Sequence, residues 1–72
     1  MALYKTGLVR RKLVFDGRLL VERLRELTRI VAEKDVLPED IDQFKTSVDA
    51  LANELADWRA EAVGSLESRL VG

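Results

Sequence analysis

The acidic residues Glu39, Asp40 and Asp42 come nearest in this sequence to a set of metal ligands. Hard cations such as Ca²⁺ need about six to eight oxygen ligands, usually from a loop with a sharp turn, and this spacing does not supply one. Since carboxylates stabilise the positive end of a helix, we interpret the cluster as the first turn of a helix. Asp57 and Glu61 form a second acidic pair, but two helices offer no cleft that would separate their pKa values for acid/base catalysis.

The residue types needed for most other chemistry are missing. The chain has 72 residues with no His and no Cys, so the common zinc, haem and iron–sulfur ligand sets are absent. Its Ser and Thr hydroxyls have no His to activate them, and a Lys base would need a buried pocket that so small a chain cannot enclose. The four glycines are scattered and form no phosphate-binding loop. We therefore predict a protein that is not an enzyme and binds no metal or cofactor.

Basic residues are concentrated at the start of the chain. Residues 1–15 contain four bases and no acid, whereas residues 38–72 contain three bases and eight acids. Such a segment can bind phosphate, an anionic membrane or an acidic protein surface. It also contains many apolar side chains that need burial, and the acids of the C-terminal part would repel nucleic-acid phosphates. We predict a basic amphipathic arm over residues 1–15 that docks on protein.

The most regular apolar spacing begins at Pro38. Alternating intervals of three and four residues predict a helix over about residues 38–70, with apolar positions Ile41, Phe44, Val48, Leu51, Leu55, Trp58 and Ala62. Pro38 suits the first helical position because its φ is already helical and it has no N–H to satisfy. The pattern breaks at Gly64-Ser65, where we expect a bend or break in the helix.

A second set of apolar residues with helical spacing predicts an earlier helix over about residues 17–35: Leu20, Leu24, Leu27 and Val31. Pro38 should hold Leu37 in an extended conformation and end this helix before it. Asp16-Gly17 is also the dipeptide of a tight β-hairpin turn, so a small β-hairpin over residues 12–21 competes with a helix there. A third possibility is a continuous helix that starts near Leu8.

Two helices with so short a connection must lie antiparallel. Pairing the two apolar seams places Val31 opposite Phe44, Leu27 opposite Val48, Leu24 opposite Leu51, Leu20 opposite Leu55 and Gly17 opposite Trp58. The missing side chain of Gly17 would leave room for the indole ring. The predicted fold is therefore all-α: a coiled-coil-like antiparallel helical hairpin over residues 16–72 with a basic N-terminal arm. Because a chain of this size buries only about 60% of its unfolded surface, we expect oligomerisation to complete the fold.

Two further patterns predict where partners bind. The arm's apolar residues and bases should contact the acidic, apolar C-terminal segment of the same chain, of another copy or of a partner protein. Ala52, Ala56 and Ala60 recur every four residues, which either lets another helix approach closely or reflects the high helix propensity of Ala. The predicted partner-binding residues are Leu8, Arg10, Arg11, Lys12, Leu13, Phe15, Ala52, Ala56, Ala60, Val63, Leu66 and Leu70.

These patterns predict a non-enzymatic assembly or interaction subunit of a larger homo- or hetero-oligomeric particle, such as a phage structural or accessory protein. The alternative is a small nucleic-acid-associated dimer whose basic arm contacts phosphate. No stretch approaches the roughly 20 apolar residues of a membrane span. The expected location is cytoplasmic or particle-associated.

Overall fold

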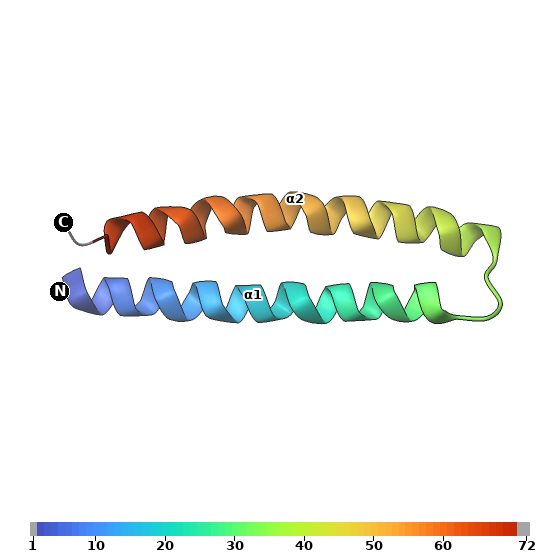
Figure 1. Ribbon diagram of the computed structural model, residues 1–72, viewed down its shortest axis with the longest axis horizontal. Coiled ribbons are helices and arrows are strands. Elements are labelled where there is room, and N and C mark those ends of the chain that lie inside the picture. The colour runs from blue at the N-terminus through green and yellow to red at the C-terminus, as the bar shows by residue number, and fades with distance from the viewer. Residues whose placement is uncertain (1, 71–72) are drawn as a thin grey trace.

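The protein forms two long helices in a computed structural model that describes residues 2–70 and the side chains of residues 7–70. Helix α1 spans Ala2–Ala32, helix α2 spans Pro38–Ser68, and residues 33–37 connect them. The helices lie side by side and antiparallel, giving a rod of 53 × 19 × 15 Å (Figure 1). We call the end with the connection the loop end and the other the open end. The predicted all-α helical hairpin is confirmed.

Helix α1 was predicted over about residues 17–35, but it starts at Ala2 and ends at Ala32. Asp16 and Gly17 are helical, so the β-hairpin turn does not form and the continuous helix is the alternative that is confirmed. An ion pair of 3.1 Å between Lys12 and Asp16, one turn apart, lies on this stretch. Continuity places Leu13 and Leu20 at the same helical position, seven residues apart, where both can pack on α2. Tertiary packing thus outweighs the local turn preference of Asp-Gly.

Helix α2 begins where it was predicted to begin. Leu37 is extended, with φ −90° and ψ 155°, and its backbone N–H donates to the Asp40 carboxylate at 3.1 Å. Glu39 and Asp40 occupy the first turn, where they stabilise the positive end of the helix. The helix continues through Gly64 to Ser68, so the expectation of a break at Gly64-Ser65 is wrong, and a bend there stays a prediction. A mid-helix glycine costs about 1 kcal/mol, which is too little by itself to end a packed helix.

The core is a narrow seam between the helices. Leu13, Leu27 and Leu51 are buried, and Leu20 is half-buried between the two buried leucines of α1. Trp58 is half-buried and lies against Gly17, where a Cβ atom would come within 3.0 Å of the indole ring. The predicted pairing of Gly17 with Trp58 is therefore confirmed.

Several residues predicted to face the other helix are instead exposed. Their exposed fractions range from 37% to 71%, and they are Leu24, Val31, Ile41, Val48 and Leu55. The predicted seam is therefore wrong at these five positions, whereas its other large members are buried or half-buried: Leu20, Leu27, Phe44, Leu51 and Trp58. The apolar stripe of each helix is wider than one facing helix can cover, and the side chains at its edge remain in contact with solvent.

Candidate functional site

The line of contact divides the hairpin into two long faces of opposite character. On α1, Leu13, Leu20 and Leu27 recur every seven residues and face α2. The residues three positions after each of these leucines lie on one side of the contact line, and the residues four positions after lie on the other side. The same holds on α2 for residues recurring every seven from Phe44. Because the helices are antiparallel, the residues three positions after the facing residues of both helices lie on the same face of the hairpin. The residues four positions after the facing residues of both helices lie on the opposite face.

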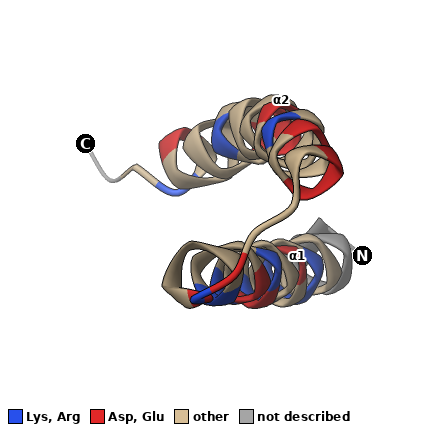
Figure 2. Ribbon diagram, turned by 90° about the vertical axis from the view of Figure 1, so that its right-hand side faces the viewer, with Lys and Arg blue, Asp and Glu red and all other residues tan. Residues whose placement is uncertain are grey.

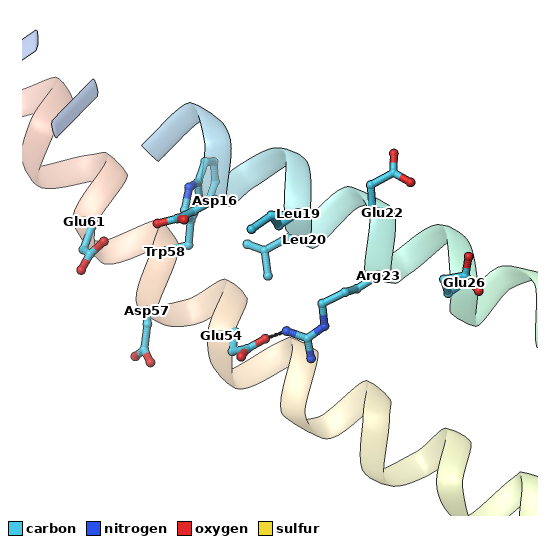
Figure 3. Close-up of a pocket in the computed structure, with 10 residues that line it drawn as sticks. All are labelled: Asp16, Leu19, Leu20, Glu22, Arg23, Glu26, Glu54, Asp57, Trp58 and Glu61. Carbon is cyan, nitrogen blue, oxygen red and sulfur yellow. Dashed lines mark ion pairs between the residues drawn. The ribbon is translucent and has the colours of Figure 1, made fainter. Parts of the chain in front are cut away.

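One of these faces carries an open, acidic groove between the helices (Figure 3). Arg23 on α1 forms an ion pair with Glu54 on α2 across it, and both side chains are about half exposed. Its lining residues are Asp16, Leu19, Leu20, Glu22, Arg23, Glu26, Glu54, Asp57, Trp58 and Glu61. We call this side of the hairpin the polar face. Among the described residues, no group of three or more acidic side chains is placed to hold a metal ion.

Lys12 lies near this groove towards the open end of the molecule. Its ammonium donates a hydrogen bond of 3.1 Å to the Asp16 carboxylate. This bond, followed by the charges of Asp16 and of Glu61 on α2, raises the pKa of Lys12 above its ordinary value of 10.5. Lys12 is therefore a cation at neutral pH that pairs within α1 and feels the charge of Glu61 on α2.

Trp58 fixes the two helices in register at the same level. Its indole Nε1 donates a hydrogen bond of 2.8 Å to the backbone carbonyl of Leu13, while its ring covers Gly17. The absence of a side chain at Gly17 lets the ring approach the α1 backbone closely enough to make this bond. The contact is structural, because the indole N–H is used within the hairpin.

The opposite side of the hairpin is rich in exposed aliphatic side chains, and we call it the apolar face. Its residues on α1 are separated by seven or three residues, and those on α2 flank the contact line on the same side. Each is between 37% and 71% exposed. They are Val14, Val21, Leu24 and Val31 on α1, and Ile41, Val48, Leu55 and Leu66 on α2.

Most residues of this face were not among the predicted partner-binding residues. On α1 the sequence does contain the signal, because Val14, Gly17, Val21, Leu24, Thr28 and Val31 are spaced by three and four residues. That pattern overlaps the seam of Leu13, Leu20 and Leu27, so the sequence alone does not show which stripe the other helix covers.

The predicted partner-binding residues of the arm lie at separate places on α1. Leu13 is inside the hairpin, only 7% exposed, and cannot be reached by a partner while the hairpin is folded. Leu8 and Phe15 remain exposed on the outer side of α1. Of the three apolar residues Leu8, Leu13 and Phe15, docking within one chain thus buries Leu13, and burial of the other two stays a prediction about a second molecule.

The predicted residues on α2 also do not gather at one place. Ala52, Ala56 and Ala60 are all exposed, but a spacing of four residues advances about 40° per step around the helix. The three alanines therefore wind from the edge of the apolar face round to the back of α2. Val63, Leu66 and Leu70 are exposed near the open end, and Leu66 alone of these belongs to the apolar face.

A basic patch on α1, which borders the apolar face at Val14, contains three arginines. Arg10, Arg11 and Arg18 line a shallow depression together with the exposed ring of Phe15. Among the described residues none of the three forms an ion pair, whereas further along α1 Arg25 and Arg29 pair with Glu22 and Glu26. We call these three arginines the arginine patch.

Comparisons with known proteins add no further constraint. The chain matches no protein-family model, no curated protein and no solved structure. Within the described residues, neither helix combines the length and the apolar character needed to cross a membrane.

Proposed function

We propose that this protein is a non-enzymatic assembly subunit, which functions by packing its apolar surface against other protein chains of a larger oligomeric particle. The observation that supports the proposal is the exposed area. The chain exposes 6387 Å², whereas a compact protein of its mass of 8.2 kDa exposes about 4,500 Å². The difference of about 1,900 Å² exceeds the roughly 800 Å² that each partner buries in a standard protein–protein interface.

The composition of that surface supports the same reading. Monomeric proteins rarely expose contiguous apolar patches larger than a few hundred Å². Here eight large aliphatic side chains of the apolar face are exposed together, while only Leu13, Leu27 and Leu51 are buried among the described residues. A hairpin with so small a core has little free energy of folding of its own, because ordering the chain opposes most of the gain from burial. Association supplies the missing burial.

The proposal is tested by the concentration dependence of thermal unfolding. If folding is coupled to association, the midpoint of the helix signal in circular dichroism rises with protein concentration, because mass action favours the assembled state. The measurement covers concentrations from below 1 μM to about 1 mM, where interfaces of micromolar to millimolar affinity are populated. A midpoint that stays constant over this range, in a chain that sediments as a monomer throughout, would refute self-association.

A second candidate function rests on the arginine patch. Arg10, Arg11 and Arg18, which form no ion pair with the described residues, line one depression together with the exposed ring of Phe15. Such an arrangement is suited to phosphate contact and base stacking. In this case the chain is a small nucleic-acid-associated protein. Binding to a random-sequence DNA or RNA fragment should then weaken steeply with salt. Replacing the three arginines by Gln should abolish binding, whereas replacing the ion-paired Arg25 and Arg29 should weaken it little.

A further inference from the structure

We propose that the apolar face is the interface of a homodimer, in which a second copy of the chain packs face to face with its loop end at the opposite end of the rod. The product is a four-helix bundle. The inference rests on the proposed function and names its partner. It goes beyond that function because it specifies which surface is buried, how many chains take part and in which direction they run.

The shape of the apolar face selects another helical hairpin as its occupant. The face is made by two adjacent antiparallel helices of 31 residues each, and its aliphatic residues extend from Val14 to Val31 and from Ile41 to Leu66. Helices pack by setting rows of side chains at intervals of three and four into matching grooves on the partner. A second copy presents the same rows over the same length, so a two-fold axis can bury both faces completely.

The borders of the apolar face are compatible with burial. By their position in the heptad, Lys45 and Arg59 lie along its outer edge on α2 rather than beside the contact line. Their long aliphatic stems can cover the rim of an interface while the charges stay in water. No carboxylate occupies the inner row of the face between its ends: Gly17, Leu24 and Val31 on α1, and Ile41, Val48, Leu55 and Ala62 on α2. At the open end the same row continues to the cations Arg10 and Arg69.

The area to be buried is that of a stable dimer. The surface in excess of a compact chain is about 1,900 Å², and the interfaces of obligate homodimers bury roughly 1,000 to 2,500 Å² on each partner. The polar face cannot supply such an interface, since six carboxylates line its groove and two copies stacked there would place like charges together.

Charge at the two ends of the rod determines the direction of the second copy. Residues 33–42 at the loop end contain five acids and one base, and Figure 2, viewed from this end, shows red at the connection and at the start of α2. At the open end, Arg10, Arg11, Lys12 and Arg69 outnumber Glu61 and Glu67. Two copies with their loop ends together would bring ten acids to one end. With loop ends apart, each basic end lies beside an acidic one.

The first test measures mass and identifies the buried face. Sedimentation equilibrium of the wild-type chain should give twice the chain mass of 8.2 kDa. The double variant Leu24→Gln/Leu55→Gln, which changes two side chains of the apolar face, should raise the dissociation constant at least 100-fold. The matched control Leu19→Gln changes a leucine of similar exposure on the polar face, 47% against 53% for Leu24, and should shift it less than threefold.

The second test measures direction in the unaltered interface. Because the chain has no Cys, a single Lys34→Cys substitution carries one spin label at each loop end. Pulsed electron resonance should give a separation between labels close to the 53 Å length of the rod. Loop ends at the same end would give a separation on the order of 10 to 20 Å, one or two helix spacings, and would overturn the proposal.

The outcomes separate this inference from the proposed function. A trimer or larger species, a short distance between labels, or dissociation caused by Leu19→Gln and not by the apolar-face variant would overturn the dimer and leave an assembly subunit standing. A chain that stays monomeric at every concentration, with a constant unfolding midpoint, would overturn the dimer and self-association, and would leave only assembly with chains of another kind. Binding of a nucleic-acid fragment by a monomer that keeps its apolar face exposed would replace both with the second candidate function.

Discussion

At the scale of single residues, the contact of Trp58 with Gly17 specifies how the helices meet. A Cβ added to Gly17 would lie 3.0 Å from the indole ring, which the hydrogen bond to Leu13 holds in place. Gly17→Ala should therefore lower the free energy of unfolding. Overpacking typically costs about 1 to 3 kcal/mol, which is more than the roughly 1 kcal/mol that Ala gains over Gly in a helix. Urea unfolding monitored by circular dichroism measures the difference.

Gly64 provides the matched control for this substitution. It also lies inside a helix, but a Cβ added there meets nothing within 4 Å. Gly64→Ala should therefore raise the free energy of unfolding by about 0.8 to 1 kcal/mol through helix propensity alone. Equal stabilisation by both substitutions would show that Trp58 does not press on Gly17.

The ion pair of Lys12 predicts a pH dependence on the alkaline side. The hydrogen bond to Asp16, then the charges of Asp16 and Glu61, raise the pKa of Lys12 in the folded state. A raised pKa of a cation contributes stability that is fully present below its ordinary value of 10.5 and is lost as the pH rises through the folded value. Asp16→Asn should lower the pKa of Lys12 towards 10.5, measured by NMR titration of its side chain.

The remaining effect of Glu61 can be separated from that of Asp16. Glu61→Gln should lower the pKa of Lys12 by less than Asp16→Asn does, since the hydrogen-bonded partner contributes most. Glu67→Gln, which alters another acid of α2, serves as the control and should leave the Lys12 titration unchanged. A Lys12 pKa that does not respond to loss of the Asp16 charge would contradict the pair.

At the scale of elements, α1 and α2 are joined across the polar face by the ion pair of Arg23 with Glu54. Both side chains are about half exposed, so solvent screens the pair and it should contribute only about 0.2 to 1 kcal/mol. A double-mutant cycle with Arg23→Gln and Glu54→Gln should give a coupling energy in this range. The coupling should decline between low salt and 1 M salt, where the screening length is only about 3 Å.

The pair of Glu22 with Arg25 is the control within one helix. It has the same chemistry at a spacing of three residues, and its coupling should be about 0.2 to 0.5 kcal/mol. Neither pair should alter the mass of the assembly, because both lie outside the apolar face. A coupling above about 3 kcal/mol for Arg23 and Glu54 would be typical of a buried pair and would contradict their exposure.

At the scale of the whole molecule, the separation of charge between the ends predicts selective pairing of designed variants. Arg10→Glu/Arg11→Glu makes both ends acidic, and Glu39→Lys/Asp42→Lys makes the loop end much less acidic. At low salt the first variant should dimerise more weakly than wild type. A mixture of the two variants should form heterodimers in preference to the acidic homodimer. In the heterodimer the acidic open end of the first variant lies beside the less acidic loop end of the second, which reduces the repulsion between the chains. Native mass spectrometry counts the species.

Salt is the control for this experiment. At 1 M salt the interactions between exposed charges are largely screened, and the two variants should mix close to the statistical proportion while apolar burial holds the dimers together. If the acidic variant dimerised at low salt as strongly as the wild type, charge would not determine the direction of the second copy.

Much of the hairpin was predictable because its signals are local. The start of α2 follows from Pro38, which cannot continue a preceding helix but fits the first turn of a new one, and from the acids that follow it. The pairing of Gly17 with Trp58 was predictable because two regular apolar patterns joined by a short connection allow few registers. The size of the chain predicted too little burial for a fold that stands alone, which is the basis of the proposed assembly.

What only the tertiary structure decided is which part of each wide apolar stripe meets the other helix. Leu24 and Leu27 are the same residue type one turn apart, yet Leu27 is 7% exposed and Leu24 is 53% exposed. Sequence spacing gives the direction of a side chain around its own helix, whereas burial depends on the rotation of that helix against its neighbour. The continuity of α1 through Asp16-Gly17 was decided in the same way, since burial of Leu13 against α2 is a long-range contact that no local turn preference contains.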